Sequence, residues 1–334
     1  MRLEELGEAS LIRRLKKRFS RANPRILRAI GDDTAVTLID KKRCLLTTTD
    51  TLVERIHFNP DYAPPYHLGR KVVSISLSDI AAMGGSPLFF LVSAAMPPRT
   101  TLEFFDEFYK GIEDCAGEFG VSLIGGNTSS SKEIVVTGTM LGEALKGEVI
   151  YRSGAGKGDA VYLTGTAGDS ALGLKVLKER GISAAKKGPF KDAVMRHLNP
   201  KARVRAGMTI ARKKLATSMI DVSDGVLADL RHICEESKTG ARVEFGRLPL
   251  SDDVRGHLKE NPADFEFVLA GGEDYELLFT AAPGKEREIS AAAKGLGLRI
   301  TRIGEILPRR SGISVAGEGG AKVRIKKEGY EHFR

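Results

Sequence analysis

Four acidic clusters are the residues of this sequence best suited to chemistry. They lie where strands or helices are expected to end: "GDDTAV" (31–36), "LLTTTDTL" (45–52), Asp79 and "SMIDVSDGVLADL" (218–230). Carboxylate, hydroxyl and carbonyl oxygens are the ligands that a hard cation such as Mg²⁺ prefers. Each cluster alone is a weak signal, and their joint presence is the informative feature. If the protein handles phosphates, we expect carboxylates and Mg²⁺ to do so.

The first two clusters also have ordinary structural interpretations. Asp32 and Asp33 follow Gly31, where an acidic side chain often closes a turn by bonding its own backbone. The second cluster, at the end of an apolar strand, contains Thr47, Thr48, Thr49 and Asp50. These residues could instead be the polar end of an edge strand with no metal bound.

Asp79 shares one face of an expected helix with apolar Val72 and Ile75. A carboxylate that faces a core is costly unless it is paired, hydrogen-bonded or bound to a metal. A metal contact is the favoured interpretation, and a buried cap or ion pair is the alternative.

Asp221 ends an apolar strand, and Asp224 precedes Gly225 and an amphipathic helix. Asp224 is therefore a candidate N-cap. The same arrangement also places both carboxylates at the carboxyl end of a strand, where α/β proteins bind ligands.

The stretch "LIGGNTSSS" (123–131) is typical either of a turn between strands or of a loop that closes on a phosphate. Backbone N–H groups at Gly125 and Gly126 can approach an anion where a Cβ would block it. Its position among the acidic clusters favours the phosphate loop.

The usual nucleotide motifs are missing from the sequence. "GAGKGD" (154–159) resembles a Walker A loop, but that pattern requires glycine at 151 and a hydroxyl at 158, where the chain has Tyr151 and Gly158. The sequence has no dinucleotide fingerprint, kinase H-R-D or D-F-G set, HExxH or G-x-S-x-G.

Strand-like and helical segments alternate, which predicts an α/β chain. The first half has expected strands at 43–53, 89–96, 121–126 and 133–144 and helices at 67–85 and 101–120. After the glycine-rich joint 151–160, the expected strands are 160–165, 218–223, 241–245 and 299–306, and the expected helices are 169–180, 203–214, 225–237 and 285–296. We therefore expect two domains, 1–148 and 149–334.

Composition excludes several classes of protein. The chain has 334 residues, 42% of them hydrophobic, and no apolar run that would cross a membrane as a helix. The N-terminus has no apolar signal segment, and Cys44, Cys115 and Cys234 are too far apart for a disulfide frame or zinc site, so a cytoplasmic location is expected. The net charge of +9 permits nucleic-acid binding, but the basic residues are dispersed and no nucleic-acid motif accompanies them.

Taken in order, these stretches resemble the thiamine-monophosphate kinases, a family of the aminoimidazole-ribotide-synthetase-like superfamily. The resemblance spans nearly the whole chain. It depends most on "SDIAAMGG" and "GGEDYEL", together with "GDDTAV", "TTTDTLVERIHF", "LIGGNT", "RSGAGKGD", "TGTAGDSALGL", "IDVSDGVLADL" and the terminal "GYEHF".

The resemblance implies an N-terminal ferredoxin-like half that forms a homodimer and a C-terminal α/β half. It implies that ATP is held by several Mg²⁺ ions and leaves a monovalent-cation requirement open. The implied metal ligands or their surroundings are Asp33, Thr48, Thr49, Asp50, Asp79, Asn127, Asp221 and Asp224, of which Asp50 and Asp224 act in catalysis through bound metal. The implied ATP contacts are Gly126, Asn127, Arg152, Ser223 and Tyr109, and the implied contacts to thiamine phosphate are His57, Glu273 and Tyr330.

The reaction implied by the resemblance is in-line transfer of the γ-phosphoryl group of ATP to thiamine monophosphate. One residue departs from the family pattern: many relatives have Asp where this chain has Asn127, which puts one metal contact in doubt. The alternatives are a sister enzyme, such as a ribotide or selenophosphate synthetase or a hydrogenase-maturation protein, and a non-catalytic basic protein that binds nucleic acid. The position of Cys44 inside an apolar strand counts against a selenophosphate synthetase.

Overall fold

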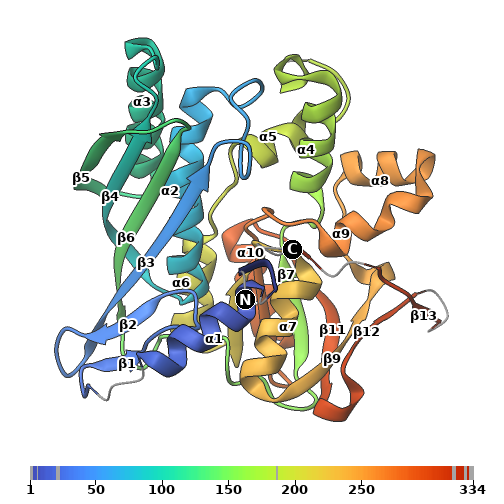
Figure 1. Ribbon diagram of the computed structural model, residues 1–334. Helices are drawn as coiled ribbons and strands as arrows, with labels where there is room; N and C mark the ends of the chain where they lie inside the picture. The colour runs from blue at the N-terminus through green and yellow to red at the C-terminus, as the bar shows by residue number, and fades with distance from the viewer. Residues whose placement is uncertain are drawn as a thin grey trace.

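The computed structural model describes residues 3–5, 7–19, 23–185, 187–317, 321–326 and 329–330. Its N-terminal half is built on a six-stranded sheet in the order β1-β2-β3-β6-β4-β5 (Figure 1). Neighbouring strands are antiparallel except for β4 and β5, which are parallel. The strands are β1 (Ile26–Arg28), β2 (Ala35–Leu38), β3 (Arg43–Val53), β4 (Ser86–Met96), β5 (Ser122–Ser130) and β6 (Val135–Leu145).

Two long helices pack on one face of this sheet, α2 (Pro65–Ala82) and α3 (Leu102–Glu118). Pro65 suits the first turn of α2, since that turn has no use for its missing N–H. The Oγ1 atom of Thr101 accepts a hydrogen bond from the backbone N of Phe104 at 3.2 Å and so caps α3. The apolar faces of both helices are buried against the sheet, which places the N-terminal core between them and β3, β4 and β6.

The C-terminal half contains a seven-stranded sheet in the order β13-β12-β9-β11-β7-β10-β8. Its helices pack around this sheet (Figure 1). The strands are β7 (Ala160–Thr164), β8 (Ser218–Asp221), β9 (Thr239–Glu244), β10 (Leu277–Ala281), β11 (Ile300–Pro308), β12 (Ile313–Ala316) and β13 (Lys322–Val323). The α-helices are α4 (Asp169–Arg180), α5 (Lys191–Leu198), α6 (Val204–Arg212), α7 (Val226–Ser237), α8 (Asp252–Glu260), α9 (Glu266–Ala270) and α10 (Glu286–Leu296), and α1 (Glu8–Arg18) precedes the N-terminal sheet. The 3₁₀ turns are η1 (Leu3–Glu5), η2 (Ile182–Ala185), η3 (Phe245–Arg247), η4 (Pro262–Phe265) and η5 (Arg309–Ser311).

The direction of the strands corrects one step of the sequence argument. β8, which ends at Asp221, runs antiparallel to β10, and β9 with β12 is the one parallel pair among the described strands of this sheet. The rule that ligands gather at the carboxyl edge of a parallel sheet therefore does not apply to β8. Asp221 nevertheless ends its strand, as expected, and its surroundings come from the other half of the chain.

Helix α2 connects the two halves, because it packs on its own sheet and also on α6 and β8. The closest approach is at Gly207 of α6, where an added Cβ would lie 2.1 Å from the carbonyl oxygen of Ala81. Only glycine allows the two helices to come this close. The carboxyl end of α2 is thus pressed against the C-terminal half.

A buried ion cluster holds part of the C-terminal core together. Glu276, which is fully buried, accepts from the guanidinium groups of Arg196 (Nη2 to Oε1, 2.6 Å) and Arg203 (Nε to Oε2, 2.6 Å) and from Thr164 Oγ1 at 2.6 Å. Both arginines contact the same carboxylate, so the buried negative charge of Glu276 is paired and hydrogen-bonded.

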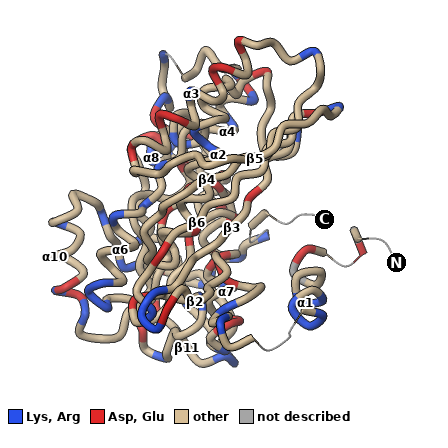
Figure 2. Tube along the Cα trace, turned by 90° about the vertical axis from the view of Figure 1, so that its left-hand side faces the viewer, with Lys and Arg blue, Asp and Glu red and all other residues tan. Residues whose placement is uncertain are grey.

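The charged residues are spread over many elements. In Figure 2, acidic and basic segments lie next to each other on α1 and around α6 and α10. The net charge of +9 therefore forms no single continuous stripe in this view. Among the described residues, no helix is both long enough and apolar enough to cross a membrane.

Candidate active site

Three carboxylates from three distant parts of the chain meet between the two halves. Asp33 lies between β1 and β2, Asp79 lies on α2, and Asp221 ends β8. One oxygen of each lies within 4.8 Å of the others. The acids at 33, 79 and 221 that the sequence singled out are therefore brought together, and Asp50 adds its charge to the group.

Hydroxyl groups orient these acids. Ser78 Oγ donates to Asp221 Oδ2 at 2.6 Å, Ser76 Oγ donates to Asp50 Oδ2 at 3.1 Å, and Thr48 Oγ1 donates to Asp79. Ser76, Ser78 and Asp79 all belong to α2, so one helix supplies two of the donors and one of the acceptors. Thr49, by contrast, is exposed and donates to the carbonyl oxygen of Gly138 at 3.1 Å.

The electrostatics of this cluster favour a cation. Burial raises the pKa of Asp33 to about 7 and that of Asp221 to about 6. Burial also raises the pKa of Asp50 to about 6. Burial, followed by the charges of Asp50, Asp221 and Asp33, raises the pKa of Asp79 well above its ordinary value. Asp33 Oδ2 is buried and accepts no hydrogen bond from the described residues. Packed carboxylates with an orphaned oxygen fit a divalent cation such as Mg²⁺.

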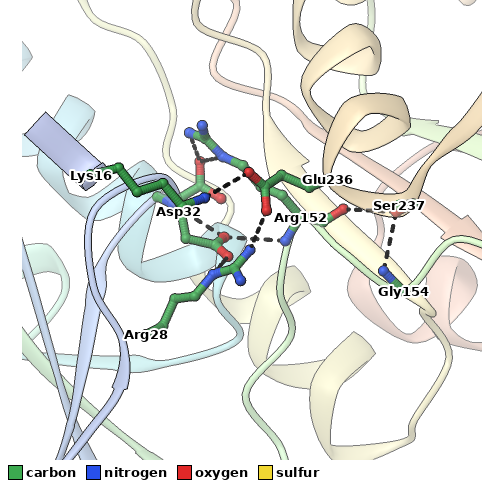
Figure 3. Close-up of polar contacts among 8 residues, drawn as sticks. Lys16, Arg28, Asp32, Arg152, Gly154, Glu236 and Ser237 are labelled. Atoms are coloured by element: carbon green, nitrogen blue, oxygen red, sulfur yellow. Dashed lines mark hydrogen bonds and ion pairs between the residues drawn. The ribbon is translucent and has the colours of Figure 1, made fainter. Parts of the chain in front are cut away.

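Arg152 pairs with Asp33, one acid of the cluster, and Figure 3 shows the polar network around Arg152. Its guanidinium holds Asp33 Oδ1 from Nη2 at 2.7 Å and from Nε at 3.2 Å, and its backbone N donates to Asp32 Oδ1 at 3.1 Å. Burial lowers the pKa of Arg152, but the charge and hydrogen bond of Asp33, together with the charges of Asp32 and Asp221, raise it above its ordinary value. This arginine is therefore a fixed positive charge beside the acids.

The same network ties α1 and β1 to α7. Arg28 reaches Asp32 Oδ2 from Nε at 2.6 Å and Glu236 Oε2 from Nη2 at 3.0 Å, and Lys16 Nζ lies 3.0 Å from Glu236 Oε1 (Figure 3). Ser237 Oγ accepts from the backbone N of Gly154 at 3.1 Å. Residues 31–34 of "GDDTAV" form a bend, in which Asp32 Oδ1 accepts from the backbone N of Asp33 at 3.3 Å, and Ala35 begins β2. This bend presents Asp33 to the acidic cluster.

A cavity of about 1320 Å³ opens beside the cluster, and both halves of the chain line it. The residues of the sequence prediction that line it are Thr49, Asp50, His57, Ser223, Asp224, Glu273 and Tyr330. All three contacts implied for thiamine phosphate therefore face the same cavity as two of the acids.

Comparison with known proteins identifies the family. Residues 31–144 match the model of the family "AIR synthase related protein, N-terminal domain". Residues 156–316 match the model of the family "AIR synthase related protein, C-terminal domain". Thiamine-monophosphate kinase of Escherichia coli K12 is 36% identical over 328 residues, which cover 98% of both chains, and that of Aquifex aeolicus is 34% identical over the full length of both. The chain belongs to the thiamine-monophosphate kinase family.

Solved structures agree with this assignment. AaThiL complexed with AMPPCP and TMP has a TM-score of 0.85 and 32% identity, with 99% of both chains covered. The thiamine-monophosphate kinase structure from Aquifex aeolicus has a TM-score of 0.79 at 31% identity, with 97% of this chain and 99% of that chain covered. These matches confirm the aminoimidazole-ribotide-synthetase-like fold that the resemblance implied.

One buried acid that the sequence analysis missed lies next to Asp224 in this member of the kinase family. Asp229 accepts hydrogen bonds from the backbone N atoms of Asp224 (3.2 Å) and Gly225 (3.0 Å), so it caps α7 from inside the helix. The N-cap residue of α7 is Gly225, which corrects the N-cap interpretation of Asp224. The position of Asp229 among the buried apolar residues of α7 is the sequence signal that could have found it.

The stretch 123–131 differs from the phosphate loop we expected of a thiamine-monophosphate kinase. Residues up to Ser130 form the exposed edge strand β5, and Asn127 is paired with Ser93 of β4. An added Cβ at Gly126 would lie 1.8 Å from the carbonyl oxygen of Val92. The close approach of the two strands therefore accounts for this glycine. Neither Gly126 nor Asn127 is among the described residues that line the cavity.

Tyr109, another expected ATP contact in this kinase family, also lies outside the cavity lining that the structure describes. It is half-buried on α3, with its ring centroid 4.6 Å from that of Phe105 and 5.2 Å from that of Phe108. Within this chain the ring is part of the packing of α3. Its contact with ATP stays a prediction.

Proposed function

We propose that this protein transfers the γ-phosphoryl group of ATP to thiamine monophosphate, producing thiamine diphosphate and ADP. The observation that carries the proposal is the meeting of Asp33, Asp79 and Asp221 with Asp50, which adds its charge to this group and lines a cavity shared by both halves. Relatives support it directly, since the Escherichia coli relative is a thiamine-monophosphate kinase and AaThiL is complexed with AMPPCP and TMP.

Mg²⁺ is the proposed metal. Asp33, Asp79 and Asp221 would hold it, with Asp50 adding its charge, whereas Asp224 belongs to a second group of possible metal ligands with Asp229 and His232. Buried carboxylates with raised pKa values repel one another until a cation is present. When bound, Mg²⁺ supplies charge neutralisation for the phosphates of two anionic reactants.

The chain's own residues then supply alignment. Thr48, Ser76 and Ser78 fix the carboxylates, and Arg152 adds a positive charge held rigidly by Asp33. A phosphate monoester oxygen is already a nucleophile near neutral pH, so the site requires no strong general base. We infer that in-line positioning and electrostatic stabilisation carry the rate.

Recognition of the thiamine part is assigned to His57, Glu273 and Tyr330, which line the same cavity. The backbone N of Val53 donates to His57 Nδ1 at 3.1 Å, which sets a tautomer with the ring hydrogen on Nε2. Glu273 and Tyr330 supply an acid and an aromatic ring, which suit a cationic thiazolium. The roles of Gly126, Asn127, Ser223 and Tyr109 toward ATP are proposed on the family resemblance alone.

A homodimer is proposed through the N-terminal sheet. β5 is an exposed edge strand, and large apolar side chains are exposed on it and on the paired end of β4: Leu123, Ile124 and Phe89. An apolar edge of this kind pairs readily with another chain. A cytoplasmic location is proposed because the three cysteines are free and buried.

The test of function mixes the purified protein with Mg·ATP and thiamine monophosphate and follows thiamine diphosphate by chromatography. Asp50→Asn and Asp224→Asn should each lower turnover by about 10²-fold or more, since each removes a charge beside the reacting phosphates. Asp40→Asn is the matched control, because Asp40 is an exposed acid that bonds Arg43 away from the cavity.

The outcome that contradicts the proposal is a protein that binds ATP and forms no thiamine diphosphate. A sister enzyme of the superfamily would consume ATP with a different acceptor and leave thiamine monophosphate unchanged. Light scattering of the purified protein tests the homodimer separately.

A further inference from the structure

Glu273, on the cavity wall, is held from behind by a buried lysine. Lys71 of α2 places Nζ 2.7 Å from Glu273 Oε1, and its side chain is 5% exposed. A buried ammonium is stable only with a partner of opposite charge. This ion pair also joins the two halves, because α2 belongs to the N-terminal half and Glu273 precedes β10.

The second oxygen of Glu273 faces a histidine. His197 Nδ1 of α5 lies 3.4 Å from Glu273 Oε2 and 3.0 Å from Ser170 Oγ of α4. Burial, reinforced by the charge of Lys71, lowers the pKa of His197 to about 3, so the imidazole is neutral. Serine and carboxylate approach the same nitrogen, whereas a nucleophilic triad uses both ring nitrogens. The arrangement therefore fits positioning and does not fit nucleophilic catalysis.

The backbone at this carboxylate is strained. Glu273 has a φ of 68° and Tyr275 a φ of 50°, and such values are rare for residues other than glycine. The backbone N of Glu273 donates to the carbonyl oxygen of Ser223 at 2.8 Å, and that of Tyr275 donates to Val222 at 2.9 Å. Such conformations persist only where the surroundings hold them. The Lys71 ion pair thus acts on a segment bonded directly to the turn that bears Asp224.

Glu273 faces the large cavity, whereas Lys71 lies behind it. Ser170, His197 and Glu273 line the large cavity. Lys71 and His197 line a small adjoining pocket of about 10 Å³, together with His67. Lys71 is not among the described residues of the large cavity, so it acts on a bound molecule through Glu273.

We propose that Lys71 is the positioning residue that fixes the carboxylate of Glu273 against the cationic thiamine part of the substrate. The proposal rests on the proposed function, since it assigns Glu273 to thiamine monophosphate. Its consequence is specific. Loss of Lys71 should weaken recognition of thiamine monophosphate and leave ATP recognition unchanged.

The test is a double-mutant cycle of Lys71→Met and Glu273→Gln, with KM measured for both substrates. Lys71→Met removes the ammonium group, and the carboxylate of Glu273 then takes up a proton or moves away from its position. Glu273→Gln removes the charge of the carboxylate directly. Each single variant should raise the KM for thiamine monophosphate about tenfold, with the KM for ATP within about twofold. The double variant should be no worse than the poorer single variant, and Lys71→Arg should recover most of the affinity.

Arg70→Met is the control, because it removes neighbouring contacts of α2 (Arg70 Nη2 to Glu118 Oε1, 2.8 Å, and Nε to Asn199 Oδ1, 2.9 Å), and Arg70 is not among the described residues that line the cavity. It should lower the melting temperature and leave both KM values unchanged. The proposal is overturned by additive single effects, by equal rises in both KM values, or by an Arg70→Met variant that behaves like Lys71→Met.

Calorimetric titration with thiamine monophosphate in the absence of ATP distinguishes failure of the proposed function from failure of the proposal about Lys71. If the wild type binds thiamine monophosphate but forms no thiamine diphosphate, the same cycle is read from the dissociation constants. If the wild type does not bind thiamine monophosphate at all, the proposal about Lys71 fails together with the function. If the Lys71→Met variant does not fold, the double variant takes its place, because it buries no unpaired charge. The affinity of the double variant for thiamine monophosphate must then equal that of the Glu273→Gln variant.

Discussion

Replacing Asp221 by Asn should stabilise the metal-free protein while it weakens the response to Mg²⁺. Asp221 is buried, accepts from Ser78 at 2.6 Å and lies within 4.8 Å of two other carboxylates. Asn is nearly isosteric and keeps an oxygen for the Ser78 hydroxyl. The substitution therefore removes mainly the charge.

The size of the effect follows from the pKa of Asp221. The pKa of Asp221 is about 6 in the folded protein and 3.8 for an unperturbed aspartate. The folded state therefore binds the proton more tightly than the unfolded state does. The ionised form thus opposes folding above pH 6, by about 3 kcal/mol for a difference of about two pKa units. This penalty disappears as the pH falls from about 6 toward about 4. At about 2.1 cal/mol/K per residue, a chain of this length changes its melting temperature by about 4 °C for that free energy.

The assay is thermal unfolding followed by circular dichroism, with EDTA or with Mg²⁺, at pH 8 and at pH 5. In EDTA at pH 8, Asp221→Asn should melt about 4 °C above the wild type, and the difference should shrink at pH 5. Added Mg²⁺ should raise the melting temperature of the wild type more than that of the variant, since binding to the native state stabilises it. A variant that melts below the wild type in EDTA at pH 8, or that gains as much from Mg²⁺, would refute the reasoning.

Two further predictions concern the fold. Glu276→Gln should cost about 3–5 kcal/mol in urea unfolding, because it leaves the guanidinium groups of Arg196 and Arg203 with no carboxylate; a loss below about 1 kcal/mol would contradict this. Gly126→Ala should displace the edge strand and lower the melting temperature, because its Cβ would lie 1.8 Å from a carbonyl oxygen, whereas Gly125→Ala, with the nearest atom 4.0 Å away, should be better tolerated. Equal melting temperatures for the two variants would argue against the strand packing as the cause.

Much of the fold could be predicted because long, periodic segments carry strong signals. The expected strand 43–53 coincides with β3, and the expected helix 169–180 coincides with α4. Short edge strands such as β1 and β13 carry no such signal, since their pairing is decided by neighbours distant in the chain. The second part of strand β5 was also missed, because its glycines and Asn127 have low strand propensity, while pairing with β4 holds them in the strand.

The site was predictable in its residue types and less so in its partners. Each acid could be found as a carboxylate at the end of an element, and Asp79 as an acid on an apolar helix face. The pairing of Lys71 with Glu273 joins residues far apart in the chain, and no local pattern indicates it. Buried polar groups are paired in three dimensions, so sequence identifies the member of a pair that needs a partner but does not identify the partner.

The contact between Gly207 and Ala81 has a consequence for engineering this protein. With 2.1 Å between an added Cβ and a carbonyl oxygen, any side chain at position 207 would push α2 and α6 apart and widen the spacing between the halves. Asp79 and Ala81 lie on the same helix turn, while Asp221 belongs to the other half. The residue at position 207 thus sets the spacing between the two halves. Variants there would change the distance between the acidic groups without altering any group that holds the substrate.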